Sequence, residues 1–203
     1  MRLWYLFRSI LRRLHMWWRA SRFRRHGAYI GKRVWIGSRV VTDWPFAQFL
    51  EVQDDVTLGD GTNIILHDAT LTVVTGDVPA RFGKVTIGRG TCLGHQVTVM
   101  PGVTIGEQSL IGACSLVTKD IPPRSFAFGV PARVRGTIDE LRTRYLDRME
   151  EELARGDSHI AYWEVPAWHE HRVEWSHARS SRERFLRDHN PQNVPQRGKQ
   201  AGK

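Results

Sequence analysis

The chain has 203 residues, of which 41% are hydrophobic and 25% are charged, so it can bury a core and does not belong to the disordered class. Lys and Arg number 30 against 21 Asp and Glu, which gives a formal net charge of +9. Two cysteines exclude a disulfide scaffold and a four-cysteine zinc cluster, and the lack of any run of about 18 apolar residues excludes a spanning helix.

Residues 1–27 contain the first predicted element, a basic amphipathic helix. No Asp or Glu precedes Asp43, whereas eleven basic residues do. At about 100° per residue, one face of residues 2–19 gathers apolar side chains: Leu3, Leu6, Phe7, Ile10, Leu14 and Trp17, widened by Trp4, Leu11 and Trp18. Arginines interrupt this stretch too often for the h-region of a signal peptide. The face fits either a membrane interface or a protein surface, and nucleic acid is disfavoured because no nucleic-acid-binding motif accompanies the charge.

The middle of the chain contains a six-residue repeat. From Ile87 it reads IGRGTC, LGHQVT, VMPGVT, IGEQSL, IGACSL and VTKDIP. An aliphatic residue opens each unit, and Gly follows it in four of the six. Upstream, Ile30-Gly31 and Ile36-Gly37 show the same spacing. Residues 42–51 and 69–84 break its phase, so we interpret them as loops that leave the repeat.

The period of six indicates short strands joined by tight turns, because it matches neither an α-helix nor a lone strand. Stacking such units would bury the opening aliphatic residues as one column. The glycines suit turns in which the backbone needs unusual dihedral angles. An ordinary β-sandwich is the alternative, but hairpin strands do not hold one spacing over six units.

These motifs resemble those of the hexapeptide-repeat acyltransferases. The likeness covers residues 28–136 and includes the closing segment VTKDIPPRSFAFGVPARVRG at 117–136. LHDATL at 66–71, followed by a loop and GKVTIG at 83–88, is similar to the branch of sugar, maltose and xenobiotic O-acetyltransferases. The resemblance implies a mainly β fold, a left-handed parallel β-helix with three hexapeptides per coil, and assembly as a homotrimer.

Acyl transfer to a hydroxyl or amine requires a base for the acceptor's proton, and histidine is the usual base at neutral pH. His67 stands where the upstream repeats meet the 69–84 loop. By resemblance, His67 is the catalytic general base, and the acceptor attacks acetyl-CoA directly in a ternary complex. Position alone leaves the alternative of a turn histidine with a surface hydrogen bond. Asp68 would point to the other face of an extended segment, so we do not expect it to orient the His67 ring.

Five further residues are expected to bind the acyl donor, acetyl-CoA. We interpret His95, in a turn, as lining the carrier groove rather than as a second base. By resemblance, Ala113, Thr118 and Lys119 match positions that touch the pantetheine arm and the nucleotide, and Arg133 is a candidate for the phosphates. Ordinary surface charge is the alternative for Lys119 and Arg133.

We expect no metal requirement and no cysteine nucleophile. Neither Cys92 nor Cys114 has a basic neighbour in the repeat register that would activate its thiol. Residues 159–177 contain four histidines, but their spacing fits no zinc pattern.

The C-terminal part, residues 137–188, is predicted to be a helical extension. Thr137 and Glu140 form a capping box, and apolar residues at helical spacing predict a helix over 138–155. A short basic helix is expected over 180–188, and the polar tail 189–203 is expected to be disordered.

The sequence thus predicts an acetyl-CoA-dependent O-acetyltransferase that acts on a sugar or polysaccharide precursor. It would lie in the cytoplasm, and the membrane alternative for residues 2–19 would place it on the inner face of the cytoplasmic membrane. N-acetylation of an amino sugar or antibiotic, a non-catalytic β-helix and a zinc-dependent β-helical carbonic anhydrase are the alternatives. The last needs several histidines in the coils, where only His67 and His95 occur.

Overall fold

The computed structural model describes residues 17–155. The chain divides into two compact units, Met1–Leu141 and Arg142–Lys203, and the strands that the structure describes lie in the first. Among the described residues, no helix combines the length and the apolar character that crossing a membrane demands. The predictions for residues 2–16, 159–177, 180–188 and 189–203 lie outside the described residues.

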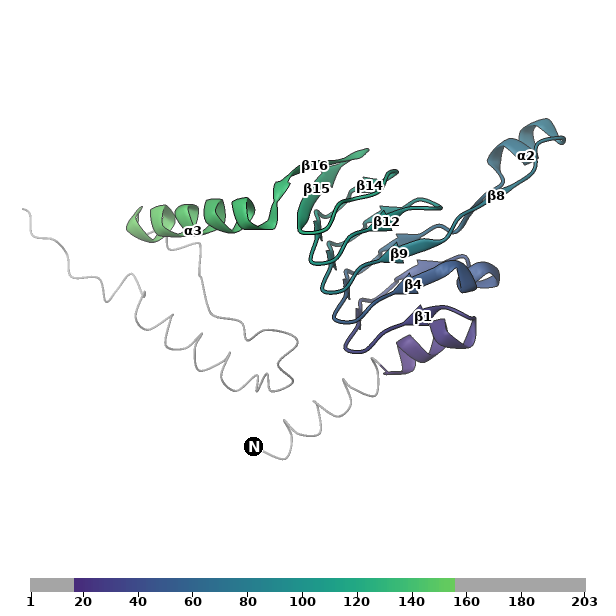
Figure 1. The fold of residues 1–203 in the computed structure, drawn as a ribbon, viewed down its shortest axis with the longest axis horizontal. Helices are drawn as coiled ribbons and strands as arrows, with labels where there is room; N and C mark the ends of the chain where they lie inside the picture. The colour runs from purple at the N-terminus through teal and green to yellow at the C-terminus, as the bar shows by residue number, and fades with distance from the viewer. Residues whose placement is uncertain (1–16, 156–203) are drawn as a thin grey trace, which may run out of the picture. The chain divides into compact units, whose positions relative to one another are not determined.

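The chain winds through three parallel sheets in turn, which is the arrangement typical of the left-handed β-helix (Figure 1). Sheet 1 contains β1 (Tyr29–Ile30), β4 (Leu50–Val52), β9 (Val85–Ile87) and β12 (Thr104–Ile105). Sheet 2 contains β2 (Trp35–Ile36), β5 (Thr57–Leu58), β10 (Cys92–Leu93), β13 (Leu110–Ile111), β15 (Ser125–Gly129) and the antiparallel β16 (Ala132–Thr137). Sheet 3 contains β3 (Val41–Thr42), β6 (Asn63–Ile64), β11 (Thr98–Val99) and β14 (Leu116–Val117). The predicted fold is therefore confirmed.

The core is a stack of inward-pointing residues in strict register. The predicted opening aliphatics are all buried, with exposed fractions of 0–1%: Ile87, Leu93, Val99, Ile105, Ile111 and Val117. In sheet 2, for example, Ile36, Leu58, Leu93 and Ile111 stand in line across four paired strands. Each such side chain contributes about 1.5–3 kcal/mol when it leaves water, so the column is the main source of stability.

The glycines that follow the opening aliphatics are required for a different reason from the one expected. None of Gly88, Gly94, Gly106 and Gly112 has a positive φ. A Cβ on Gly94 would instead lie 2.6 Å from the backbone nitrogen of Ala113 in the next coil. The left-handed conformation falls two residues later, where Gly90 and Gly102 alternate with Gln96, Gln108 and Cys114. The expectation about dihedral angles therefore holds for Gly90 and Gly102. It is wrong for the glycines that follow the aliphatic residues, where close stacking of the turns excludes a side chain.

Two excursions interrupt the stack. The 3₁₀ segment η1 (Trp44–Phe49) follows β3, in the first predicted loop. The second loop is an arm in which β7 (His67–Asp68) pairs antiparallel with β8 (Arg81–Phe82), with the short helix α2 (Thr70–Thr75) between them. Figure 1 shows the arm projecting away from the coils, with α2 at its tip.

The N-terminal end of the stack is closed by residues 17–25, which are helical. Ala20 and Phe23 face inward and are 7% and 3% exposed. Among the described residues no coil precedes the one that begins with β1, so its outer carbonyl groups need other partners. Arg24 donates through Nη2 to the carbonyls of Ile30 and Gly31 at 2.7 and 2.9 Å, and Arg19 donates to the carbonyl of Ile36 at 2.9 Å. Side chains thus replace the missing coil.

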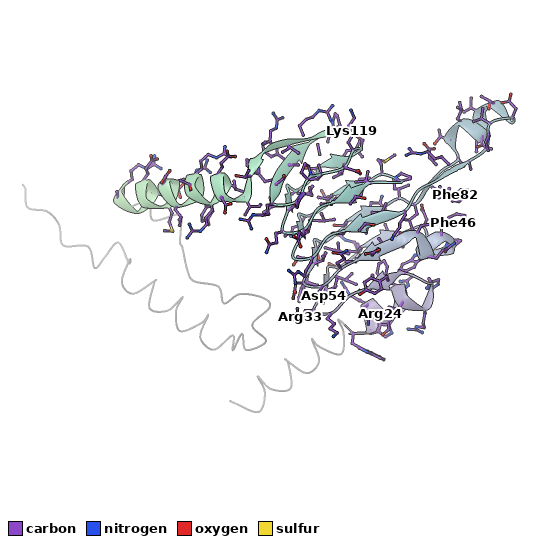
Figure 2. All side chains as sticks on the ribbon, viewed as in Figure 1. Arg24, Arg33, Phe46, Asp54, Phe82 and Lys119 are labelled. Atoms are coloured by element: carbon purple, nitrogen blue, oxygen red, sulfur yellow. The ribbon has the colours of Figure 1, made fainter. Side chains whose placement is uncertain are left out.

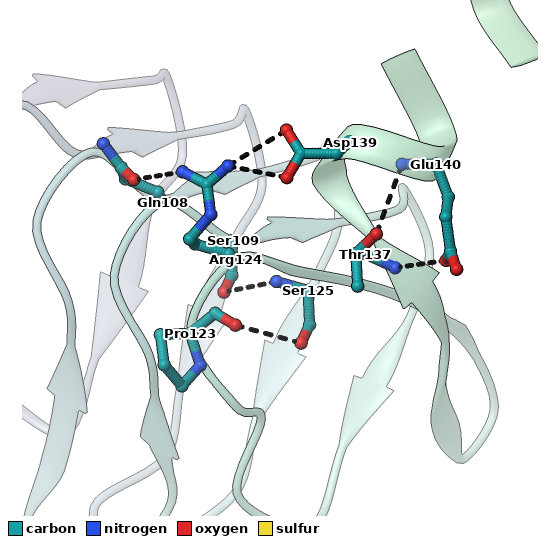
Figure 3. Close-up of polar contacts among 8 residues, drawn as sticks. All are labelled: Gln108, Ser109, Pro123, Arg124, Ser125, Thr137, Asp139 and Glu140. Carbon is teal, nitrogen blue, oxygen red and sulfur yellow. Dashed lines mark hydrogen bonds and ion pairs between the residues drawn. The ribbon is translucent and has the colours of Figure 1, made fainter. Parts of the chain in front are cut away.

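The other end closes with the β15–β16 hairpin and the start of α3 (Ile138–Arg155), which confirms the predicted helix and its capping box (Figure 3). The Thr137 backbone N–H donates to Glu140 Oε2 at 2.8 Å, and the Glu140 N–H donates to Thr137 Oγ1 at 3.2 Å. Arg124 bonds both oxygens of Asp139 and also Gln108, which ties the first turn of the helix to the last coils.

Candidate active site

Both excursions leave the stack at the same edge. We call the column of turns that follow β3, β6, β11 and β14 the 3–1 edge, because these turns lead from sheet 3 to sheet 1. It comprises residues 43–49, 65–84, 100–103 and 118–120. The excursions therefore belong to successive coils at one edge, and side chains from the two come into contact there.

His67, the predicted base, contacts an aspartate from the other excursion. Its Nδ1 lies 2.8 Å from Oδ2 of Asp43. The same oxygen accepts hydrogen bonds from the backbone N–H groups of Leu66 at 2.7 Å and His67 at 3.2 Å. The side chains of His67 and Asp43 are 34% and 25% exposed. The pair is thus held by several bonds while the histidine still reaches solvent.

This arrangement determines which imidazole nitrogen is available for chemistry. A carboxylate only accepts hydrogen bonds, so Nδ1 carries the hydrogen that is donated to Asp43. In the neutral ring, Nε2 is then the nitrogen with a free lone pair. An imidazole in this tautomer can take a proton from a hydroxyl or an amine at Nε2, and the carboxylate stabilises the imidazolium that forms.

Aromatic rings from both excursions pack around the imidazole. The ring centroids of Phe46 and His67 are 4.9 Å apart, and Phe82 stacks on His67 at 5.9 Å with an interplanar angle of 22°. Phe46 and Phe82 also meet edge to face at 4.8 Å, where the arm leaves the coils (Figure 2). Phe82 remains 45% exposed. The packing restricts the imidazole orientation and presents an apolar wall beside it.

Within the described residues, no hydrogen bond joins Asp68 to the imidazole of His67. The Asp68 carboxylate instead caps the end of its own strand, β7. Its Oδ1 accepts the backbone N–H of Thr70 at 2.9 Å, which holds the pKa of the Asp68 carboxyl below its ordinary value. The expectation that Asp68 does not orient His67 agrees with this geometry, because Asp43 occupies Nδ1.

The predicted donor-binding residues fall on two edges. Thr118 and Lys119 lie exposed on the 3–1 edge, two coils beyond His67. His95 and Ala113 lie exposed on the 2–3 edge, the turns 94–97 and 112–115 that lead from sheet 2 to sheet 3. The face of sheet 3 separates the two groups. One copy of the chain therefore does not bring all the predicted residues together.

Arg133 lies on β16, the last strand of sheet 2, opposite Phe128. Its guanidinium is on the surface and donates to the carbonyl of Ala132 at 3.1 Å. Neighbouring Arg135 stacks over the Phe128 ring, with its guanidinium carbon 5.1 Å from the centroid. These cations stand near the end of the stack, and within residues 17–155 no hydrogen bond joins Arg133 to the other predicted residues.

The cysteines differ in surroundings, and neither is paired with a base. Burial raises the pKa of the Cys92 thiol, which disfavours the thiolate. Cys114 is exposed and its Sγ lies 3.4 Å from Oε1 of Gln96. Within residues 17–155, no cluster of three or more His, Cys, Asp or Glu side chains has the arrangement of a metal site.

Sequence reasoning missed Asp43 and Arg81. Asp43 is the first acidic residue of the chain and stands where the repeat loses its phase, and both features were visible. Arg81 returns from the arm, and a Cβ on Gly102 would lie 3.2 Å from its Nη2. Its guanidinium therefore covers the turn of the coil between His67 and Thr118. No spacing in the sequence pointed to that contact.

Comparison with known proteins identifies the family. The bacterial transferase hexapeptide model, of six repeats, matches residues 84–119. Galactoside O-acetyltransferase of Escherichia coli (strain K12) is 35% identical over 137 residues, which cover 58% of this chain and 68% of that enzyme. A solved maltose O-acetyltransferase from Clostridium difficile 630 is 26% identical, with a TM-score of 0.48 over 57% of this chain and 72% of that one. A galactoside acetyltransferase solved with coenzyme A is 27% identical, with a TM-score of 0.47 over 54% and 64%. From the match to the Escherichia coli enzyme, the chain belongs to the hexapeptide-repeat acetyltransferases, in the branch that resembles galactoside and maltose O-acetyltransferases.

Proposed function

We propose that the protein transfers an acetyl group from acetyl-CoA to a hydroxyl of a sugar or of a polysaccharide precursor. The observation that carries the proposal is the His67–Asp43 pair on a half-exposed edge. The sugar acceptor is suggested by the likeness to galactoside O-acetyltransferase over two thirds of that enzyme's length.

The reaction would proceed by direct attack. Nε2 of His67 takes the proton of the acceptor hydroxyl, and the oxygen attacks the thioester carbonyl of acetyl-CoA. The tetrahedral adduct then collapses, the carbon–sulfur bond breaks, and the departing thiolate receives the proton from the imidazolium. The products are the acetyl ester and free CoA, and the base returns to its starting state. Asp43 retains its hydrogen bond to Nδ1 throughout and is a positioning residue.

We further propose that the complete site forms between two copies of the chain, in a homotrimer. The division of the predicted residues between the 3–1 and 2–3 edges supports this, because a neighbouring copy could present His95 and Ala113 opposite His67. Lys119 and Arg133 are assigned to the phosphates of the donor. Arg81, over the turn between His67 and Thr118, supplies positive charge beside the attacked carbonyl. The activity is placed in the cytoplasm.

The test combines thiol release with two matched histidine variants. Purified protein is supplied with acetyl-CoA and a panel containing galactosides, maltose and glucosamine, and free CoA thiol is followed. We expect turnover with a hydroxyl acceptor and a loss of about 10²–10⁴ in kcat for His67→Ala. His95→Ala should retain most of the kcat and raise the KM for acetyl-CoA.

Three results would oppose the proposal. Transfer only to the amino group of glucosamine would replace O-acetylation with N-acetylation. Equal losses of kcat in the two histidine variants would remove the special role of His67. Failure of the wild-type protein to bind acetyl-CoA in a calorimetric titration would exclude this donor.

A further inference from the structure

A groove lies over the outer face of sheet 1, and the proposed reaction does not use it. Its volume is about 430 Å³, and five side chains line it: Tyr29, Glu51, Gln53, Asp54 and Arg89. The first two are outward residues of the neighbouring strands β1 and β4, whose register places them side by side. The other three lie in turns between sheet 1 and sheet 2. We call these turns the 1–2 edge, which comprises residues 31–34, 53–56, 88–91 and 106–109.

A chain of hydrogen bonds fixes part of the polar lining of this groove. The Glu51 carboxylate accepts from Lys84 Nζ at 2.6 Å and from Gln53 Nε2 at 3.0 Å. The Gln53 amide oxygen accepts the backbone N–H of Arg89 at 3.1 Å. The Gln53 amide is therefore held in one orientation, and the contacts with Lys84 and Gln53 hold the pKa of Glu51 below its ordinary value. Groups that are already fixed lose little freedom when a ligand binds.

The rest of the lining retains capacity to contact a ligand. Tyr29 is 60% exposed, and Arg89 is exposed as well. Within residues 17–155, neither the Tyr29 hydroxyl nor the Arg89 guanidinium takes part in a hydrogen bond or an ion pair. Asp54 accepts the backbone N–H of Lys32 at 2.7 Å through Oδ1, and a carboxylate has about four acceptor sites. The groove thus presents an aromatic ring, a guanidinium donor and a carboxylate together.

This combination of groups favours a neutral ligand that is rich in hydroxyls. Carboxylates accept hydroxyl hydrogens, a guanidinium donates to hydroxyl oxygens, and the negative face of an aromatic ring attracts the C–H groups of a sugar ring. A phosphate is disfavoured, because the carboxylates of Glu51 and Asp54 would repel it. An apolar ligand would leave the polar lining without partners. A sugar unit satisfies all of these conditions, and the volume is that of a small-molecule site.

The face of sheet 1 connects the groove to the candidate active site. Figure 2 shows Asp54 at one side of the coils and Phe82, which stacks on the proposed base, at the other. Lys84 follows Phe82 by two residues and ends on Glu51 in the groove. The extended chain from Phe82 to Thr86, the partner of Glu51 in β9, spans about 13 Å. One sugar ring at the base would not reach the groove, whereas a chain of linked sugars would.

The proposed homotrimer would leave this groove open. The 3–1 and 2–3 edges, which would meet between neighbouring copies, are the two edges of sheet 3. In a coil with three sides, the 1–2 edge lies opposite sheet 3 and therefore faces away from the neighbouring copies. A glycan could lie in the groove while its end enters the site.

We propose that the groove is a glycan subsite, which binds one sugar unit of an extended acceptor while another unit of the same chain is acetylated at His67. The ring of Tyr29 stacks on the sugar, and Arg89 and Asp54 bond its hydroxyls. This inference rests on the proposed sugar acceptor and narrows it to chains of several sugar units.

Equilibrium binding tests the groove without any turnover. The full chain is titrated calorimetrically, in the absence of acetyl-CoA, with disaccharides and hexasaccharides of galactose, of glucose and of N-acetylglucosamine. We expect a hexasaccharide to bind at least about tenfold more tightly than its disaccharide, because two linked units occupy two sites. Tyr29→Ala should weaken binding of that hexasaccharide about tenfold, and Arg89→Gln should do the same. Tyr29→Phe keeps the ring and should weaken it less than about threefold.

A second exposed tyrosine and a second exposed arginine provide matched controls. Tyr145 is 57% exposed and Arg142 is exposed, and both lie on α3 and not in the groove. Tyr145→Ala and Arg142→Gln should stay within about twofold of wild type in hexasaccharide affinity. The melting temperature of Tyr29→Ala should match that of Tyr145→Ala, which separates a lost contact from a lost fold.

Kinetics with acetyl-CoA separates the groove from the proposed activity. Tyr29→Ala should raise the KM for the hexasaccharide about tenfold and the KM for the disaccharide less than about twofold. If the protein binds the hexasaccharide through Tyr29 but releases no CoA thiol, the groove stands and the proposed activity falls.

Four results would overturn the proposal. They are the absence of binding by every hexasaccharide, equal affinity for hexasaccharides and disaccharides, equal binding by wild type and Tyr29→Ala, and an equal loss in Tyr145→Ala. Acetyl transfer to disaccharides that persists beside any of these results would leave the proposed activity intact.

Discussion

The regular coils and the coils that carry the two excursions belong to one stack, but they differ in the sequence spacing of their stacked residues. Between β9 and β14, stacked partners are 18 residues apart, as for Gln96 and Cys114, and the same environment recurs in every unit. In the first coils the spacing is 22, as for Ser38 and Asp60, because η1 adds residues. The coils supply stability by repetition, whereas the His67–Asp43 pair arises where repetition stops.

This difference shows how a rigid scaffold can hold a candidate active site without weakening its hydrophobic core. Residues of the excursions that surround His67 are half-exposed, while the core residues of the coils that carry them are almost completely buried. A change in a coil should therefore alter stability, and a change in an excursion should alter catalysis. The predictions below test this separation.

The largest effect is expected inside the regular coils. Ile105→Ala removes a side chain that is 0% exposed, and should lower the free energy of unfolding by about 3–4 kcal/mol, because of the lost burial and the cavity left behind. Urea denaturation measures it. Thr104→Ala, at the neighbouring outward position, is the control and should cost less than about 0.5 kcal/mol. Similar costs at the two positions would contradict the inward column.

In the excursions, Asp43→Asn should lower kcat about 100-fold, or about 2.7 kcal/mol. The amide can place an N–H against Nδ1 and so favour the wrong tautomer of His67. Steady-state kinetics should show little change in the KM for acetyl-CoA, while the melting temperature changes little. Asp68→Asn is the matched control and should stay within about threefold of wild type. A parallel fall in stability and kcat would reduce Asp43 to a structural role.

Two glycine variants test whether a glycine is needed because the next coil lies too close for a side chain or because the backbone φ is positive. Gly94→Ala should cost about 2–3 kcal/mol, because its Cβ would meet the backbone of Ala113 at 2.6 Å. Gly90→Ala should cost only about 1 kcal/mol, since φ is +69° but the space is open, with Gln108 Cγ at 3.5 Å. Thermal denaturation ranks them. The reverse order would restore the explanation from dihedral angles.

The smallest effect concerns the ion pair where the arm rejoins the coils. Lys84 donates to Glu51 at 2.6 Å and holds the pKa of that carboxyl below its ordinary value. The resulting stability is present above the ordinary pKa of 4.5 and is lost as pH falls through the lowered one. Lys84→Met should remove less than about 1 kcal/mol at neutral pH, and the melting temperature should fall less steeply with acid than in wild type. Lys32→Met is the control. The prediction fails if the melting temperature of Lys84→Met falls with acid as steeply as that of wild type, or if Lys32→Met shows the same reduced slope.

The fold was predictable because each hexapeptide repeats the same information. The spacing placed Ile87 and Ile105 in the core without knowledge of any partner, and a capping box placed the start of α3. The role of the glycines was not predictable in the same way. The spacing shows that Gly94 precedes a turn. Glycine could be needed there because of the backbone dihedral angles or because a Cβ would clash with the next coil, and the choice depends on how closely the coils stack.

Half of the candidate site was predictable. His67 stood at the mouth of an interruption in a motif that resembles a catalytic segment. Asp43 lies 24 residues earlier, and its meeting with His67 depends on the length of a coil that contains η1. That length follows from the register of β3 on β6, which pairs Val41 with Asn63 and is not visible in the period of six. The splitting of His95 and Lys119 between two edges likewise required the order of the sheets.

The arginines that bind carbonyls of the first coil also affect whether molecules of this protein can associate end to end. An open end of a β-helix offers β1, β2 and β3 as a row of unsatisfied strand edges, onto which another β-helix could add end to end. Arg24 and Arg19 bind the carbonyls of Ile30 and Gly31 and of Ile36, at the ends of β1 and β2, and the helix that carries them covers this end of the stack. A truncation that removed residues 17–25 would uncover a growth face, and the expected product is a filament of stacked coils rather than a smaller soluble enzyme.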